Sequence, residues 1–268
     1  MRPKRSLGQN FLTNPHVVNK IIEFADVGQR DSVLEIGPGR GIMTAALAKV
    51  SARVTAVEKD DDLAEYLAAE YAAQTCIRIV HGDILELDLE ALAPAGTKLV
   101  ANLPYNIATA VILRLVETPR HYASITVMVQ KEVAERICAD KGTRDYAGLS
   151  VLTGVNFKTA AGFLVGPGNF SPRPKVDSMV IKLIPREKTM AATDLRHLKT
   201  VVFGAFGQRR KMLRNSWSGL PGMNAELLNN LAEEAGIDLG KRPQDLSIDD
   251  FKRFSGLYQS LPGNETAP

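Results

Sequence analysis

The chain of 268 residues contains only two cysteines and no apolar run long enough to cross a membrane. Cys76 and Cys138 are far apart and match no metal-ligand spacing, so the sequence offers neither a disulfide framework nor a zinc site. Each lies among apolar residues, and we expect each to be a small buried core residue. No secretory signal peptide is recognisable. These absences predict an intracellular, cytoplasmic protein with no metal and no membrane partner.

The composition is that of a folded protein with a slight excess of positive charge. Hydrophobic residues make up 45% of the chain and charged residues 24%, enough for a proper core. The net charge is +3, and the isoelectric point is near 8.8. This balance is compatible with an RNA partner, but only local clustering of the charges can decide the point.

Short apolar segments alternate with helical segments through the first half of the chain. Strands are predicted at 32–36, 52–57, 76–80, 98–101 and 124–129, and helices at 41–50, 60–73, 108–115 and 131–138. This alternation favours an α/β fold with a parallel, doubly wound sheet. Two later strands, 150–157 and 178–184, have only loop between them, so we expect an antiparallel addition at one edge.

The ends of the chain lie outside this alternation. Asn14-Pro15 is a helix-start signal, followed by an apolar helical face. Beyond Pro185 only helical patterns remain. We therefore predict two domains, 1–185 with the sheet and 186–268 as a small all-helical domain, with a frayed tail from Leu261.

A glycine loop joins the first predicted strand of the sheet to its helix. Gly37, Gly39 and Gly41 give the spacing G-x-G-x-G, whereas a dinucleotide fingerprint would need glycine at position 42, where Ile42 stands. The G-x-G-x-G spacing is typical of S-adenosylmethionine sites, in which the backbone approaches the methionine part of the cofactor. The loop has no phosphate-binding lysine, and such a site needs none.

Two acidic residues follow the next two strands. Glu58, about twenty residues beyond the loop, can accept hydrogen bonds from both ribose hydroxyls. Asp83 can accept from the adenine amino group of the cofactor while Ile84 covers the ring. Each acid alone could be a solvated turn residue or a helix cap, but the combination with the glycine loop predicts an S-adenosylmethionine site.

The stretch Asn102-Leu103-Pro104-Tyr105 directly follows the fourth strand. The Asn102 side-chain oxygen and the Leu103 carbonyl can both accept hydrogen bonds from one exocyclic amino group. Pro104 restricts the backbone, and Tyr105 offers a face on which a flipped-out base can stack. Taken alone, the four residues could equally form a β-turn with a buried tyrosine.

The predicted topology connects this stretch with the glycine loop. In a doubly wound sheet, ligands bind beyond the carboxyl ends of strands at the point where the strand order reverses. The first and fourth strands should flank that point. Gly37 and Asn102 follow these two strands, so we expect the methyl donor and the base holder to face one another.

Several motifs resemble the small-subunit (16S) ribosomal RNA adenine-N6,N6-dimethyltransferase family, a Rossmann-like group of S-adenosylmethionine-dependent methyltransferases. The resemblance covers nearly the whole chain, to about Tyr258. The motifs that carry it are Leu7-Gly8-Gln9-Asn10-Phe11-Leu12, Glu35–Gly41, Gly82-Asp83-Ile84, Asn102–Tyr105, Phe170–Ser178 and Gln208–Asn215. Met212 stands where we would expect Thr or Ser.

The resemblance implies a reaction and additional site residues. It implies that Asn10 and Leu12 line the cofactor pocket, and that Phe170 stacks on the target base opposite Tyr105. The implied reaction transfers methyl groups from S-adenosylmethionine to N6 of two adjacent adenines near the 3′ end of 16S rRNA, within a small-subunit precursor. We expect no essential side-chain base, and we expect a monomer.

The densest basic cluster lies in the helical domain and comprises Arg209, Arg210, Lys211 and Arg214. Such a run usually marks a solvated helix face. Beside the basic N-terminal residues Arg2, Lys4 and Arg5, and with a base-holding site, an RNA phosphate track is the better interpretation.

Three alternatives stay open at the level of sequence. The chain could be a large-subunit rRNA adenine methyltransferase of the macrolide-resistance type, although the motifs at 7–10 and 209–215 favour the small-subunit type. It could be a ribosome-assembly or nucleic-acid-binding factor without turnover, although the motifs at 37–41 and 102–105 are intact. DNA adenine methylation is a weaker alternative, because these pocket residues do not distinguish RNA from DNA.

Overall fold

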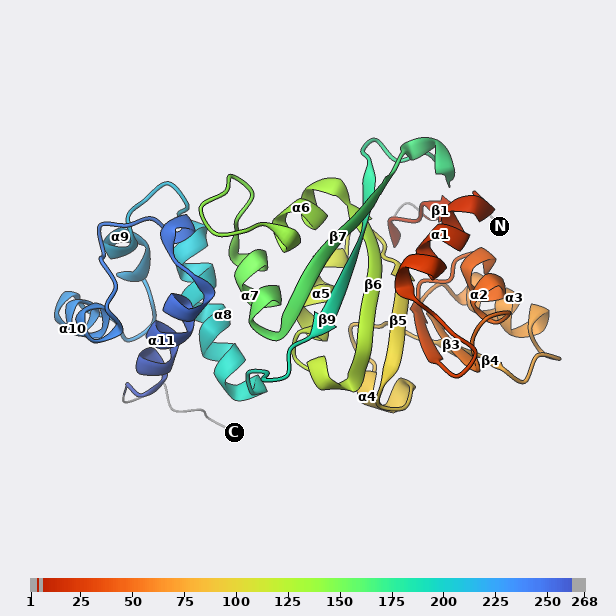
Figure 1. Cartoon of the computed structure of the whole chain (residues 1–268), viewed down its shortest axis with the longest axis horizontal. Helices are drawn as coiled ribbons and strands as arrows, with labels where there is room; N and C mark the ends of the chain where they lie inside the picture. Colours follow the sequence, from red (N-terminus) through yellow and green to blue (C-terminus); the bar gives the residue numbers. More distant parts are fainter. Residues whose placement is uncertain (1–3, 5–6, 262–268) are drawn as a thin grey trace. The chain divides into compact units, whose positions relative to one another are not determined.

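The structure, a computed structural model, describes residue 4 and residues 7–261 (Figure 1). Arg2, Arg5 and most of the predicted tail lie outside these residues. The chain divides into two compact units. The first unit comprises Met1–Ala134 and Lys158–Arg186, and the second comprises Glu135–Phe157 and Glu187–Pro268.

A seven-stranded sheet forms the centre of the first unit, in the order β4-β3-β2-β5-β6-β9-β7. Strands β2 to β6 pair in parallel, and β9 pairs antiparallel with β6. The strands are β2 Ser32–Ile36, β3 Arg53–Glu58, β4 Ile77–His81, β5 Thr97–Asn102, β6 Tyr122–Gln130, β7 Phe157–Val165 and β9 Ser178–Pro185. The predicted α/β fold, with its parallel, doubly wound sheet, is confirmed. The order reverses between β2 and β5, as the sequence predicted.

Helices flank the strands, and those within residues 42–115 connect the parallel strands. They are α1 Pro15–Ala25, α2 Ile42–Leu47, α3 Asp61–Glu70, α4 Leu89–Leu92, α5 Ala108–Leu115 and α6 Lys131–Cys138, with short 3-10 turns η2 Pro119–His121 and η3 Pro167–Asn169. Asn14 caps α1 by accepting from the backbone N–H of His16 at 2.9 Å, and Pro15 occupies the first turn. The predicted start of this helix is confirmed.

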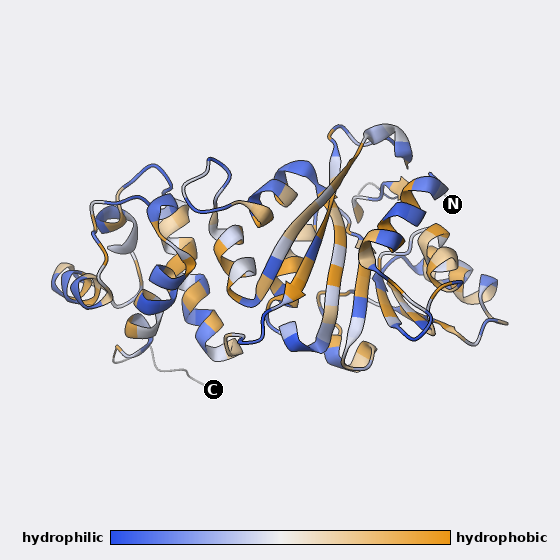
Figure 2. Cartoon of the chain, viewed as in Figure 1, coloured by the Kyte–Doolittle hydropathy of each residue, from blue (hydrophilic) through white to orange (hydrophobic). Residues whose placement is uncertain are grey.

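Apolar residues of α1 and α2 pack on one face of the sheet. Val18 and Ile21 of α1 and Leu47 of α2 join a buried cluster that includes Val33, Val54 and Val100 of three parallel strands. In Figure 2 strand β6 is mainly orange and white, as expected for a strand that is covered on both faces. None of the helices in the described part of the chain has the length and apolar content needed to span a bilayer.

The second unit is built from helices. They are α7 Gly148–Asn156, α8 Ala192–Gly207, α9 Leu213–Trp217, α10 Ala225–Ala235 and α11 Ile248–Gln259, with the 3-10 turn η4 Pro243–Asp245. Trp217 is buried in the core of the second unit. Its ring stacks on Phe254 with centroids 3.9 Å apart, and its Nε1 donates to the Val201 carbonyl at 3.0 Å.

Two expectations about this part of the chain are wrong. Residues 150–156 form most of helix α7 and not a strand; Phe157 is the first residue of the following strand, β7. Every residue from Ser150 to Asn156 is buried, so the sequence has no polar face that would reveal helical periodicity. Residues 135–157, predicted to lie in the first domain, belong to the second unit because α7 packs on α8 and α11.

Cys76 and Cys138 are free but only half-buried, so the prediction of two buried core cysteines is also wrong. Cys76 directly precedes β4, and Cys138 is the last residue of α6. The ends of elements retain solvent contact even where the neighbouring sequence is apolar.

One carboxyl group lies inside the sheet. Glu35 of β2 is completely buried, and its Oε2 accepts from the Thr44 hydroxyl of α2 at 2.6 Å. Within the described residues, Oε1 has no hydrogen-bond partner. Burial, reinforced by the nearby Glu58 carboxylate, raises the pKa of Glu35 to about 8, against 4.5 for an ordinary glutamate, while the Thr44 hydrogen bond opposes the shift.

We expect Glu35→Gln to flatten the pH dependence of stability of the first unit. Between pH 4.5 and about 8 the folded state holds the Glu35 proton and the unfolded state does not. The free energy of unfolding therefore falls as pH rises through this window. At about 1.4 kcal/mol per pKa unit, the total decrease is on the order of a few kcal/mol, and glutamine avoids it.

Urea unfolding at pH 6, 7 and 8.5, followed by far-ultraviolet circular dichroism, measures this difference. The fluorescence of Trp217, the chain's single tryptophan, reports in parallel on the second unit, in which this residue lies. An equal pH slope in wild type and variant would contradict a protonated Glu35.

Candidate active site

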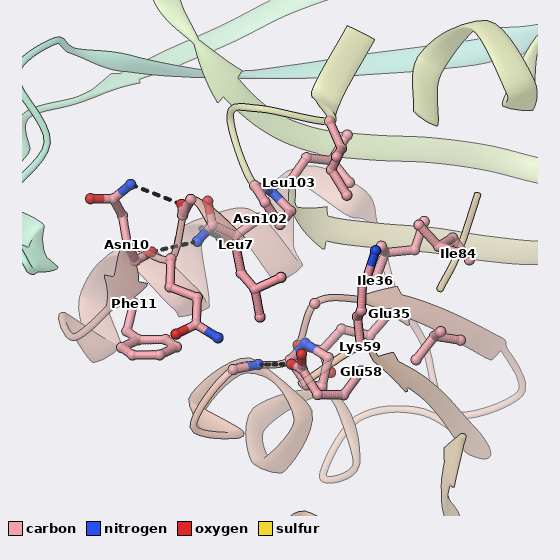
Figure 3. Close-up of a pocket in the computed structure, with 18 of the residues that line it drawn as sticks. Leu7, Asn10, Phe11, Glu35, Ile36, Glu58, Lys59, Ile84, Asn102 and Leu103 are labelled. Carbon is pink, nitrogen blue, oxygen red and sulfur yellow. Dashed lines mark hydrogen bonds between the residues drawn. The ribbon is translucent and has the colours of Figure 1, made fainter. Parts of the chain in front are cut away.

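A pocket lies beyond the carboxyl ends of β2, β3 and β5, where the strand order reverses (Figure 3). Its walls come from five segments, within 7–12, 35–43, 57–59, 82–84 and 102–107. Ile36 of β2 pairs with Ala101 of β5. The glycine loop after β2 and the Asn102 stretch after β5 are therefore neighbours, as the sequence predicted.

The glycine loop has a backbone that side chains would disturb. Gly37, Gly39 and Gly41 have φ values of 68°, 60° and 81°, in the left-handed region. A Cβ on Gly39 would lie 2.8 Å from the ring of Phe11. The loop thus gives its backbone close access to the pocket and to the N-terminal arm, residues 7–12.

Glu58 ends β3 with its carboxylate held by the backbone. Its Oε2 accepts from the Gly39 N–H at 3.1 Å, and its Oε1 accepts from the Asp60 N–H at 2.9 Å. The residue is buried, and burial raises its pKa although these amides oppose the shift. A carboxylate has further lone pairs beyond these two bonds, so Glu58 can still accept from a ligand hydroxyl.

Asp83 lies in the segment after β4 and lines the pocket. Its Oδ2 pairs with Lys59 Nζ at 2.5 Å, and its Oδ1 accepts from the Leu85 N–H at 2.9 Å. The hydrogen bond from Lys59 is the main cause of a lowered Asp83 pKa. Ile84 beside it is buried, and its carbonyl accepts from Arg114 of α5 at 2.9 Å.

The N-terminal arm closes one side of the pocket and is tied down at both ends. Lys4 Nζ, three residues before the arm, and Gln9 Nε2, within it, donate to the two carboxylate oxygens of Asp60, at 2.6 and 2.8 Å. At its end, β1 (Phe11–Leu12) pairs antiparallel with β8 (Phe170–Ser171). Both Asn10 and Leu12 line the pocket.

Asn102 connects the arm with the base-holder stretch. Its Nδ2 donates to the Asn10 carbonyl at 3.3 Å (Figure 3). With the amide nitrogen used in this way, the side-chain oxygen is the acceptor that Asn102 can offer to a ligand. The Leu103 N–H donates to the Met128 carbonyl at 3.1 Å, which anchors the stretch to β6.

Pro104 and Tyr105 complete the stretch. The Pro104 carbonyl accepts from Ile107 at 3.1 Å, in a turn that leads into α5. The Tyr105 hydroxyl lies 2.5 Å from Ser178 Oγ. Both Pro104 and Tyr105 line the pocket.

The structure does not bring Phe170 to this pocket. Its ring is only 5% exposed and belongs to the cluster of Leu12, Val17 and their neighbours beneath the arm. An apolar ring in a loop rich in glycine and proline looks like a ligand contact in the sequence, but pairing of β8 with β1 turns it inward. Phe170 therefore supports the arm, and this arrangement gives no support to the predicted stacking contact.

A second hollow, here called the arginine cleft, lies in the second unit. It is lined by Gly142, Thr143, Arg144, Arg209, Arg210, Arg242 and Gln244. Arg209 donates to the carbonyl of Arg144. Two of the four predicted basic residues contribute; Lys211 and Arg214 are exposed but do not line it. Arg144 and Arg242 could not be assigned from the sequence because they are far from Arg209 along the chain.

The histidines show no catalytic arrangement in the described residues. His81 Nε2 lies 2.8 Å from the Asp61 carboxylate at the start of α3, and His121 is buried in η2. Over the same part of the chain, no group of three or more His, Cys, Asp or Glu side chains could hold a metal ion.

Comparison with known proteins identifies the family. The family model described as "Ribosomal RNA adenine dimethylase" matches residues 1–259. The "Ribosomal RNA small subunit methyltransferase A" of Geobacter metallireducens is 40% identical, with 98% of each chain covered. The protein of the same name from Brucella anthropi is 42% identical, covering 97% of this chain and 94% of its own.

Two solved structures share the fold. A dimethyladenosine transferase from Plasmodium falciparum aligns with a TM-score of 0.75 at 25% identity, covering 91% of this chain and 95% of that one. The 23S rRNA methyltransferase ErmE aligns with a TM-score of 0.65 at 26% identity, covering 92% and 99%. On the strength of the nearly full-length family match and the 40%-identical relatives, the chain belongs to the ribosomal RNA adenine dimethylase family.

Proposed function

We propose that this enzyme transfers methyl groups from S-adenosylmethionine to N6 of two adjacent adenines near the 3′ end of 16S rRNA, giving N6,N6-dimethyladenines. The observation that carries the proposal is the position of Asn102 directly opposite the glycine loop, at the reversal between β2 and β5. One pocket thereby combines groups suited to a methyl donor with groups suited to an amino-bearing base.

The residues present fit S-adenosylmethionine. Glu58, with its carboxylate fixed by two backbone amides, is suited to bind the ribose hydroxyls. Asp83 and Ile84 are suited to the adenine, by accepting from its amino group and by covering its ring. The glycine loop, Asn10 and Leu12 would enclose the methionine part. When bound, this cofactor supplies the methyl group in activated form, so the chain needs no nucleophile of its own.

At the substrate, the protein must orient the amino group of the target adenine in the RNA. Its nitrogen is a weak nucleophile because its lone pair is delocalised into the ring. The Asn102 side-chain oxygen and the Leu103 carbonyl would accept hydrogen bonds from the two N–H bonds of this amino group and favour a tetrahedral nitrogen with its lone pair directed at the methyl group. Positioning of this kind can lower a barrier by roughly 7–11 kcal/mol.

Tyr105 would compensate for the stacking that the base gives up when it leaves the RNA, which costs a few kcal/mol. It lines the pocket next to Pro104. The pocket must also admit an amino group that already carries one methyl, because dimethylation needs two transfers at the same nitrogen.

The arginine cleft is suited to bind the RNA backbone. Four arginines around one hollow concentrate positive charge, and guanidinium groups bind phosphate in a bidentate manner. We assign Arg209 and Arg210 to this contact, with Arg144 and Arg242 added, and place Lys211 and Arg214 at its exposed border. A cleft of this kind recognises the phosphate backbone and not the base sequence.

The fold is shared with a large-subunit methyltransferase, so substrate choice depends on the closer relatives. The relatives at about 40% identity carry small-subunit names. Incubating unmethylated small ribosomal subunits and large-subunit RNA in parallel, then measuring methylated adenosines by mass spectrometry, tests the choice. Dimethyladenosine in the large-subunit sample alone would overturn the proposal.

We expect Asn102→Ala to lower kcat by roughly 100-fold or more, because the change removes one of the two acceptors for the amino group. S-adenosylmethionine binding, measured by calorimetry, should remain detectable. Asn230→Ala, an exposed position on α10, is the matched control. Near-normal turnover of Asn102→Ala would remove this residue from the amino-group holder.

We expect Glu58→Ala to raise the dissociation constant of S-adenosylmethionine by about tenfold or more, since hydrogen bonds to a charged group contribute about 1.5–3 kcal/mol. The control is Glu65→Ala, at an exposed position on α3. Calorimetry measures both constants. Equal affinities would contradict ribose recognition by Glu58.

We expect the double change Arg209→Glu and Arg210→Glu to weaken binding to small subunits. In a plot of log affinity against log salt concentration, the magnitude of the slope should decrease by about 2, which is one for each phosphate that an arginine no longer neutralises. Arg196→Glu with Lys252→Glu, both exposed on α8 and α11, reverses the same charge elsewhere in the second unit. A salt titration with filter binding provides the slopes. If both double variants behave alike, the arginine cleft has no specific role.

A further inference from the structure

Ser178 is the first residue of β9 and is completely buried. Its hydroxyl lies 2.5 Å from the hydroxyl of Tyr105, and either group can be the donor. Tyr105 is the stacking residue of the proposed function, so this contact connects the substrate face of the pocket to the sheet. The rest of the site gives Ser178 no other role.

Both partners of this contact are anchored to β6. Ser178 pairs with Gln130 in the antiparallel β6–β9 ladder, and the Lys131 N–H donates to the Asp177 carbonyl at 3.0 Å. On the other side, the Leu103 N–H donates to the Met128 carbonyl at 3.1 Å. Because β9 runs antiparallel to β6, β9 begins beside the carboxyl end of β6, which is the end of the sheet where the pocket lies. Backbone hydrogen bonds thus hold Ser178 in place, and its hydroxyl can fix the position of the Tyr105 hydroxyl.

We propose that Ser178 is a positioning residue that fixes the plane of the Tyr105 ring, and that this contact matters more for the second methyl transfer than for the first. The inference rests on the proposed function, in which adenine N6 is methylated twice. It concerns how the pocket holds a substrate that already carries one methyl group.

The difference between the two transfers follows from the hydrogens on N6. An unmodified amino group has two hydrogens, one for the Asn102 side-chain oxygen and one for the Leu103 carbonyl. A monomethylated amino group has only one, so one acceptor is left without its partner. The orientation of the base then depends more on the ring against which it stacks. A tyrosine ring restrained at its hydroxyl holds that orientation better than one restrained only at its Cβ.

The test uses Ser178→Ala, Tyr105→Phe and the double variant, with unmethylated small subunits and S-adenosylmethionine under single-turnover conditions. Tyr105→Phe keeps the stacking ring and removes only the hydroxyl. Mass spectrometry of nucleosides gives monomethylated and dimethylated adenosine over time, and hence the rate of each transfer. Ser51→Ala is the matched control, because its hydroxyl also makes one hydrogen bond in the first unit, to the Leu47 carbonyl at 2.8 Å, outside the pocket.

We expect each single variant to slow the second transfer by roughly 2- to 10-fold, the range for one neutral hydrogen bond, with a smaller effect on the first transfer. Monomethylated adenosine should accumulate. The double variant should be no slower than either single one, because both changes remove the same hydrogen bond. The dissociation constant of S-adenosylmethionine should match that of wild type.

Three results would overturn the inference. One is an unchanged ratio of the two rates in both single variants. Another is a double variant in which the rate of the second transfer falls by the product of the two single fold-decreases. That result would mean that Ser178 acts on something other than Tyr105. The third is weakened S-adenosylmethionine binding in Ser178→Ala with normal behaviour of Tyr105→Phe. Failure of the proposed function is distinguishable, because the wild-type enzyme would then form no methylated adenosine on small subunits.

Discussion

The parallel pairing of β2 with β5 is the constraint on which the pocket depends. Neighbouring strands of a sheet lie about 4.8 Å apart, so the residues that follow these two strands must lie close together. The pair Ile36–Ala101 sets the register, and the glycine loop and Asn102 continue from it. Because the helices after β2 and after β5 cover opposite faces of a doubly wound sheet, a crevice opens between the two strand ends.

The N-terminal arm turns this crevice into a pocket. Alone, a short segment with little regular structure would not hold one conformation, because ordering each residue costs about 1–2 kcal/mol. The arm is held by Asp60 near its start, by the Asn102 side chain at Asn10, and by pairing with β8 at its end. The same Asn102 side chain therefore supports the arm with its nitrogen and can serve a substrate with its oxygen.

Most of the pocket could be predicted from the sequence because the ligand-binding residues of this fold come directly after the ends of strands. Glu58, Asp83 and Asn102 each stand where an apolar strand stops, so local patterns were sufficient to find them. The remaining features depend on partners far away in the chain. Phe170 has no local partner in its glycine- and proline-rich loop, but it pairs with Leu12 across β1 and β8. The arginine cleft combines residues from three separate loops, and helix α7, buried on every side, carries no amphipathic pattern.

Four carboxyl groups lie in or beside the pocket, and each has a different environment. Asp60 pairs with Lys4, and Asp83 pairs with Lys59, so both have lowered pKa values despite the burial that opposes the shift. Glu58 is satisfied by backbone amides. Glu35 lacks a cationic partner among the groups that shift its pKa, and burial keeps it protonated near neutral pH. Glu58 is thus the carboxylate that meets the pocket without a lysine partner, which suits it to bind neutral ribose hydroxyls, whereas an anionic phosphate would be repelled.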